Sequence, residues 1–150
     1  MLVVVDGNQK KSKVAAQAIV DTAWTYGLDA RFLSTEDAEP GDVASAESLI
    51  VGCAARVDTP FGGQDARSMA SWMQDLPPLG GKPVAVFCSY AFFPHTFADV
   101  TTRTAEVLDG LEQAVQAKGG TLVASEAILN RKLGEGITSL LAPFVPGDEP

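Results

Sequence analysis

The chain opens with the stretch Leu2-Val3-Val4-Val5-Asp6-Gly7-Asn8-Gln9-Lys10-Lys11-Ser12-Lys13. Its β-branched start predicts a buried strand, and the short polar loop that follows leads into an amphipathic helix expected at residues 12–26. In a doubly wound α/β domain such a loop lies at the carboxyl end of a strand and at the positive end of a helix, where anions bind. The opening stretch therefore predicts the fold class and the place of a ligand together.

Short apolar runs then alternate with helical periodicity, which is typical of a parallel sheet covered by helices on both faces. Further strands are expected at residues 30–33, 48–52, 84–88 and 121–124. Further helices are expected at residues 65–76, 104–118 and 136–144, and Pro40-Gly41 indicates a turn. Five strands with this spacing predict a single α/β domain over residues 1–150, a three-layer sandwich with strand order 2-1-3-4-5. Ligands would gather outside the carboxyl ends of strands one, three and four.

Helical spacing also predicts which residues face the sheet. In the first helix the inward stripe is expected to consist of Val14, Ala18, Ile19, Thr22 and Tyr26. In the helix expected at residues 104–118 the inward residues are Val107, Leu108, Leu111, Ala114 and Val115. These stripes predict how the two helices pack.

The composition argues against several classes of partner. The net charge of -8 and the pI of about 4.5 argue against nucleic acid, whose phosphates need a basic surface, and favour a protein partner with a basic face. No run approaches the roughly 18 apolar residues of a membrane span, and Met1 leads directly into a strand. We therefore expect a cytoplasmic protein that binds neither nucleic acid nor a membrane.

Cysteine and histidine are too few for a disulfide scaffold or a structural metal site, because the chain has only Cys53, Cys88 and His95. The two cysteines end neighbouring strands, so a redox pair is one interpretation, although free cysteine more often behaves as a small buried hydrophobe. The chain also lacks the glycine motifs of dinucleotide-binding and NTP-hydrolysing domains, the acidic residues of a receiver domain and a catalytic Ser-His-Asp arrangement. No catalytic residue is predicted, and an electron carrier or a binding protein is favoured over an enzyme.

A resemblance to a known family rests on two strand and loop junctions, Leu49-Ile50-Val51-Gly52-Cys53-Ala54 and Val86-Phe87-Cys88-Ser89-Tyr90-Ala91. With these junctions and its order of elements, the chain resembles the flavodoxin family over nearly its whole length. The resemblance implies a flavodoxin-like fold, an FMN cofactor and electron transfer to a redox partner protein. In that family the loop after the first strand holds the FMN phosphate, and the loops after the third and fourth strands flank the flavin ring. The cofactor-binding residues that this implies are Gly7, Asn8, Gln9, Lys10, Lys11, Ser12, Ala54, Ala55, Arg56, Phe61, Ser89, Tyr90, Phe92 and Phe93.

The first loop departs from the family pattern Thr/Ser-x-Thr-Gly-x-Thr, because only Ser12 matches it. Lys10, Lys11 and Lys13 oppose the dipole at the start of the helix by roughly 0.3 to 1 kcal/mol each, so they need compensation. A bound anion, such as the FMN phosphate, would supply it. The alternative is that the lysines are solvated and that Ser12 caps the helix.

The loop after the fourth strand gathers Tyr90, Phe92, Phe93 and Phe97 within eight positions. Three interpretations stay open: a small core beneath the loop, stacking of Tyr90 or Phe92 on a flavin, and a protein interface. His95 in the same loop either tunes a flavin or is an ordinary surface residue.

In the second loop, Arg56 and Phe61 would face a flavin ring, or Arg56 would pair with Asp58 at the surface. The leading hypothesis is a flavodoxin-like, FMN-binding electron-transfer protein. The alternative is an FMN-free domain of the same fold. Such a domain would bind an anion at the lysine loop and a partner, or a second copy in a homodimer, at the aromatic loop.

Overall fold

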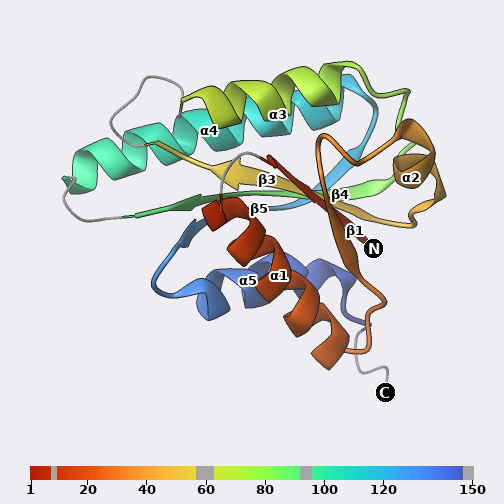
Figure 1. The fold of residues 1–150 in the computed structure, drawn as a ribbon, viewed down its shortest axis with the longest axis horizontal. Helices are drawn as coiled ribbons and strands as arrows, with labels where there is room; N and C mark the ends of the chain where they lie inside the picture. The colour runs from red at the N-terminus through yellow and green to blue at the C-terminus, as the bar shows by residue number, and fades with distance from the viewer. Residues whose placement is uncertain (8–9, 57–62, 92–95, 147–150) are drawn as a thin grey trace.

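Five parallel strands form one sheet in the order β2-β1-β3-β4-β5, and helices cover both of its faces (Figure 1). The computed structural model describes residues 1–7, 10–56, 63–91 and 96–146. Its strands are β1 Leu2–Val5, β2 Arg31–Ser34, β3 Leu49–Ala54, β4 Pro83–Tyr90 and β5 Thr121–Leu129. Its helices are α1 Lys10–Thr25, α2 Pro40–Ser45, α3 Gln64–Gln74, α4 Phe97–Ala117, α5 Leu133–Leu141 and the 3₁₀ helix η2 Ala142–Phe144. The predicted fold class and strand order are confirmed.

The sheet separates two hydrophobic cores. Helices α1 and α5 lie on one face, and α3 and α4 lie on the other (Figure 1). Because successive strand residues point to opposite faces, Ile50 and Phe87 join the core under α1 and α5, whereas Val51 and Val86 join the core under α3 and α4. Strands buried on both faces are apolar at nearly every position, which is why they could be recognised from the sequence.

The predicted inward stripe of α1 is wrong. Val14 and Tyr26 are 53% and 41% exposed, and only Ile19 of the five predicted residues is buried. The side chains on the buried face are mostly small and comprise Ser12, Ala15, Ala16, Ile19, Val20 and Ala23. Small side chains let the helix lie close to the sheet, but alanine carries a weak hydrophobic signal. The larger Val14 and Tyr26 therefore dominated the predicted pattern.

The inward stripe predicted for residues 104–118 is confirmed, since Val107, Leu111 and Val115 are buried in α4. The start of this helix was predicted too late. It begins at Phe97 because the Thr96 hydroxyl oxygen accepts a hydrogen bond from the Asp99 N–H at 3.1 Å and so caps the helix.

Pro40 begins the short helix α2 where a turn was predicted. Proline is favourable at the first helical position, and the Asp42 carboxylate accepts a hydrogen bond from the Glu39 N–H at 3.0 Å. Strand β5 also runs on to Leu129, beyond the predicted end at residue 124. The longer α4 and β5 extend regular structure toward the carboxyl edge of the sheet, where the ligand was expected.

Candidate functional site

The carboxyl ends of β1, β3 and β4 lie side by side in the sheet. The register places Val5 beside Gly52, and it places Ala54 beside Ser89. Beyond the strands, the Ala55 N–H donates to the Ser89 carbonyl at 2.8 Å. The three loops that the sequence predicts to hold FMN therefore start at one edge of the sheet, at the point where the strand order reverses.

Ser12 does not cap α1, so that interpretation is corrected. The helix begins at Lys10, and Ser12 lies within its first turn, fully buried. The Ser12 hydroxyl oxygen accepts a hydrogen bond from the Ala54 N–H at 3.1 Å. The one residue that matches the family phosphate pattern thus ties the start of α1 to the end of β3.

The three lysines of the first loop and helix lie at the surface. Lys10, Lys11 and Lys13 are exposed, and the first turn of α1 contains no acidic residue. The salt bridges found among the described residues do not include these lysines. Their charges add to the positive end of the helix dipole, and the sum attracts anions.

The loop after β1 is described at its two ends only. Gly7 lies against the end of β2, because a Cβ added to it would lie 2.9 Å from the Cβ of Ser34. Asn8 and Gln9 lie outside the described residues. The absence of a side chain at Gly7 therefore allows close packing against β2, which explains this glycine without a ligand.

The second loop is also described at its ends. Ala54 and Ala55 are buried at the end of β3, and Arg56 is exposed. The Arg56 side chain lies along Gly63, where an added Cβ would lie 3.2 Å from the Arg56 Cβ. The two ends of this loop therefore approach each other. Phe61 and Asp58, and with them the predicted Arg56 to Asp58 pair, lie outside the described residues.

In the third loop, the structure places Ser89 and Tyr90 at the end of β4. Ser89 is fully buried, and its hydroxyl has no hydrogen-bond partner among the described residues, whereas Tyr90 is half-buried. Phe97 is 74% exposed on the first turn of α4, so it does not belong to a core beneath the loop. Phe92, Phe93 and His95 lie outside the described residues, and the three interpretations of this loop stay predictions.

The two cysteines are buried register partners on β3 and β4. Both belong to the core under α3 and α4, and they do not form a disulfide with each other. Burial raises the pKa of the Cys88 thiol to about 12, because the apolar surroundings disfavour the thiolate. At neutral pH the Cys88 side chain is therefore a protonated core group and not a nucleophile.

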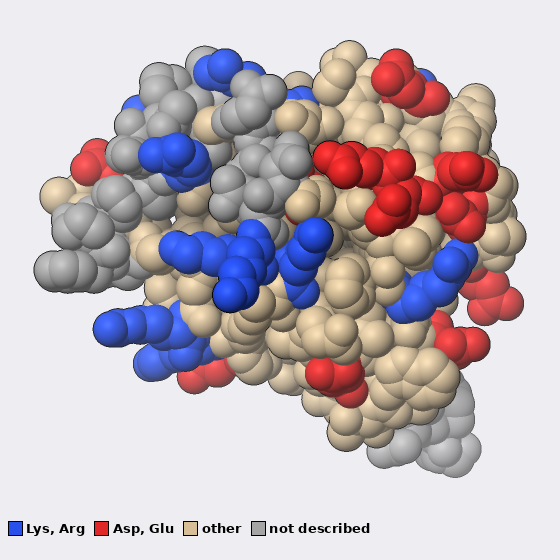
Figure 2. Space-filling view, in the orientation of Figure 1, with Lys and Arg blue, Asp and Glu red and all other residues tan. Residues whose placement is uncertain are grey.

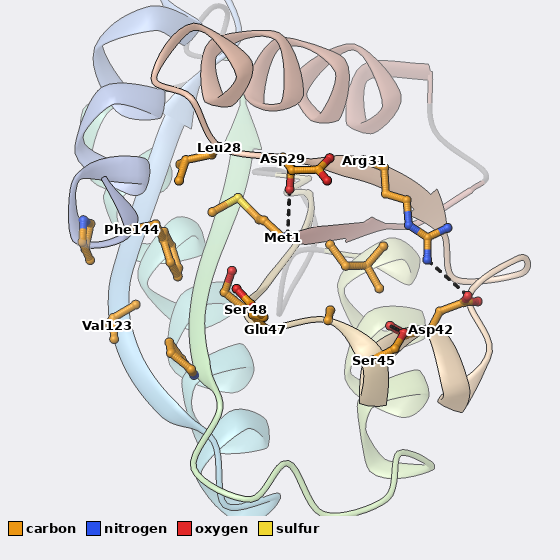
Figure 3. Close-up of a pocket in the computed structure, with 14 residues that line it drawn as sticks. Met1, Leu28, Asp29, Arg31, Asp42, Ser45, Glu47, Ser48, Val123 and Phe144 are labelled. Atoms are coloured by element: carbon orange, nitrogen blue, oxygen red, sulfur yellow. Dashed lines mark hydrogen bonds and ion pairs between the residues drawn. The ribbon is translucent and has the colours of Figure 1, made fainter. Parts of the chain in front are cut away.

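One cavity lies at the opposite, amino edge of the sheet. It measures about 780 Å³ (Figure 3). Arg31 Nη2 lies 3.3 Å from Asp42 Oδ1 on its wall, and the Met1 amino group donates to the Asp29 carbonyl at 2.9 Å. The Glu39 N–H and then the Arg31 guanidinium hold the pKa of the Asp42 carboxyl below its usual value. This cavity contains none of the predicted cofactor-binding residues.

A second cavity, of about 570 Å³, lies at the carboxyl edge. It brings Lys10 and Lys11 together with Ala91 and with the junction between β5 and α5, where Asn130 and Arg131 lie. Sequence reasoning missed this junction. The adjacent cations Arg131 and Lys132, placed between a strand and a helix, were the signal that could have found it.

The described residues include no group of three or more histidine, cysteine, aspartate or glutamate side chains that could hold a metal ion. Within the same residues, no helix is both long and apolar enough to cross a membrane.

Comparison of the chain with protein-family models finds no match, and comparison with curated proteins finds none either. Solved structures do match. A flavodoxin from Streptococcus pneumonia TIGR4 has a TM-score of 0.67 and 15% sequence identity, over 95% of this chain and 97% of its own. A flavodoxin from the domain Archaea has a TM-score of 0.65 and 17% identity, over 94% of this chain and 93% of its own. The two-electron reduced flavodoxin of Megasphaera elsdenii has a TM-score of 0.60 and 19% identity, over 93% and 95%.

At these identities the likeness establishes the fold, which is flavodoxin-like, as the sequence predicts. The likeness extends over more than nine-tenths of this chain and of each of these flavodoxins.

Proposed function

We propose that this protein is an FMN-binding electron carrier whose cofactor lies at the carboxyl edge of the sheet. The observation that carries the proposal is the convergence of β1, β3 and β4, whose loops start together at the edge where the strand order reverses. The flavodoxin-like fold supports it, because ligands of doubly wound sheets bind at this edge.

Two observations bear on whether the residues fit FMN. The Ser89 hydroxyl is buried without a partner among the described residues, and a buried hydroxyl is stabilised by a polar ligand group within reach. The Ser12 hydroxyl oxygen, by contrast, is engaged by the Ala54 N–H. The residues fit FMN, but the phosphate would be held by lysine charge and backbone N–H groups more than by side-chain hydroxyls.

In this proposal the N–H groups at the start of α1, with Lys10 and Lys11, hold the phosphate. Tyr90 lies where it would contact the ring, and Ser89 where it would donate to a polar atom. FMN supplies the redox chemistry, and the protein binds it, orients it and excludes water. The electron-transfer partner would be a protein with a basic face, in keeping with the net charge of -8.

The test is an FMN titration followed by quenching of flavin fluorescence. The wild type should quench it at saturation, and the double variant Lys10→Gln/Lys11→Gln should bind FMN at least about tenfold more weakly at low salt, since each charge-assisted contact is lost. The difference should shrink as salt is raised, because the lysine charges are exposed and screened.

Lys118→Gln is the matched control, because Lys118 lies at the far end of α4. This variant should bind FMN as the wild type does. A wild type that leaves FMN fluorescence unchanged at every ionic strength would refute the proposed function.

A further inference from the structure

The cavity at the amino edge of the sheet is built where the strands begin. It is lined at or near the starts of β1, β2, β4 and β5 by Leu2, Arg31, Pro83 and Val123, and directly before β3 by Ser48. Helix α2 and the 3₁₀ helix η2 supply further walls. The volume of about 780 Å³ falls in the range of pockets that hold small molecules. The cavity shares no residue with the cofactor-binding residues predicted at the carboxyl edge.

One side of this cavity is apolar. Figure 3 shows Leu28, Phe144 and Val123 on this side, with the Met1 side chain extending toward them. All four side chains are half-buried, so part of each stays in contact with water. Exposed apolar surface in a cavity is stabilised when a ligand covers it. The Phe144 ring also offers an aromatic face, which attracts cations.

Carboxylates predominate among the charged groups of the lining. They are those of Asp29, Asp42 and Glu47, against the Arg31 guanidinium and the Met1 amino group. Arg31 is paired with Asp42 at 3.3 Å, and the Met1 amino group donates to the backbone carbonyl of Asp29 at 2.9 Å. The salt bridges found among the described residues include neither Asp29 nor Glu47, and both residues are exposed. Their two carboxylates are therefore the groups that a ligand would meet.

The surface around the cavity is acidic as well. Figure 2 shows acidic side chains gathered over β2 and α2, the two elements that supply its charged side. The chain as a whole carries a net charge of -8. A negative field of this kind raises the local concentration of cations and repels anions.

We propose that this cavity is a ligand site for a small organic cation with an apolar body, such as an aromatic amine. The Asp29 and Glu47 carboxylates hold the cationic group, and Leu28 and Phe144 cover the apolar body. A bare metal ion fits the site poorly, because it would leave the apolar side uncovered. The described residues also form no group of three or more histidine, cysteine, aspartate or glutamate side chains that could hold one.

The probe is thioflavin T, an aromatic cation whose fluorescence rises when its rings are immobilised. The double variant Asp29→Asn/Glu47→Gln should weaken its binding about fivefold or more, because two charges that face the ligand are lost. Phe144→Leu keeps an apolar side chain but removes the aromatic face, and it should weaken binding about threefold.

Asp75→Asn/Asp109→Asn is the matched control. It removes the same number of charges from exposed residues of the described chain that lie outside the lining, so it should change the affinity by less than about twofold. Unchanged circular dichroism would show that each variant is folded when it is titrated. Equal weakening by the two double variants would mean that the dye responds to net charge alone, and it would overturn the proposal.

Competition at constant ionic strength identifies the ligand chemistry. Phenethylamine should displace the probe, because it combines a cationic group with an aromatic body. Ammonium lacks the body and phenylacetate carries the opposite charge, so neither should displace the probe at the same concentration. Displacement by ammonium, displacement by phenylacetate, or a wild type that leaves thioflavin T fluorescence unchanged would each overturn the proposal.

This site is independent of the proposed function, because the two lie at opposite edges of the sheet and share no residue. Asp29→Asn/Glu47→Gln should therefore bind FMN as the wild type does. A protein that binds thioflavin T as described but not FMN would support the cation site and refute the electron carrier. A protein that binds FMN but not thioflavin T would do the reverse.

Discussion

The Ser12 hydroxyl contributes to the fold, because its hydrogen-bonding partner is a backbone group of β3. Its oxygen accepts from the Ala54 N–H at 3.1 Å, and both groups are buried. Ala54 is the last residue of β3, where its N–H would otherwise need another acceptor. The bond therefore positions the start of α1, and with it Lys10 and Lys11, against the edge where the loops converge.

Replacing Ser12 by Ala should lower the free energy of unfolding by about 1–3 kcal/mol, because the buried Ala54 N–H loses its acceptor. Urea denaturation followed by circular dichroism measures the change. Ser139→Ala, at an exposed position of α5, is the control and should change the stability by less than about 0.5 kcal/mol. Equal stability of Ser12→Ala and wild type would mean that the bond does not hold α1 to β3.

Helix α4 is the element that most extends the carboxyl edge. It spans Phe97–Ala117, and its first turn carries the exposed Phe97 directly after the third loop. The start of the helix is held by Thr96, whose hydroxyl accepts from the Asp99 N–H, and Asp99 places a negative charge at the positive end of the helix dipole. The placement of the aromatic Phe97 at the carboxyl edge of the sheet depends on this cap.

Thr96→Ala should therefore cost about 1 kcal/mol of stability, the usual loss when an N-cap hydroxyl is removed. Hydrogen exchange should locate the loss, with faster exchange confined to the first turn of α4. Thr102→Ala changes an exposed threonine in the same helix and should be neutral or slightly stabilising. Equal exchange rates in the first turn of Thr96→Ala and of the wild type would contradict the assignment of the cap.

The molecule as a whole carries a separation of charge that its net value of -8 conceals. Cations gather at the starts of α1 and α5, and acidic side chains gather over β2 and α2 (Figure 2). An anionic ligand is therefore attracted to the carboxyl edge of a protein that is acidic overall. An anion bound at this edge would also stabilise the fold, because its negative charge offsets the repulsion between the lysines.

FMN at one hundred times its dissociation constant should raise the free energy of unfolding by about 2.7 kcal/mol, since it binds only the native state. Thermal or urea unfolding with and without FMN measures the gain. Riboflavin, which lacks the phosphate, should give a much smaller gain at the same concentration. An equal gain with riboflavin would show that the lysine edge does not recognise the phosphate.

The pattern of apolar residues along the sequence is sufficient to predict the architecture of this protein. The apolar runs of β1, β3 and β4 follow from burial on both faces of a parallel sheet, and their spacing leads to the order that the structure has. The same reasoning places the candidate ligand edge, because that edge follows from strand order. It fails for the inward face of α1, where alanines that pack tightly carry less signal than an exposed Val14.

Contacts between side chains from distant parts of the sequence, by contrast, could be identified only from the tertiary structure. The bond from Ala54 to Ser12 joins residues 42 positions apart, and the cavity at the carboxyl edge joins Lys10 to Arg131 from opposite ends of the chain. Helix phase and strand register decide such contacts, and a rotation of α1 by one residue would turn Ser12 and Val14 to other neighbours. The periodicity of the sequence indicates which face of an element is apolar. Which polar groups meet is determined by the packing of α1 against the sheet and α5. This packing depends on all the residues of the core together, so it cannot be predicted from one segment.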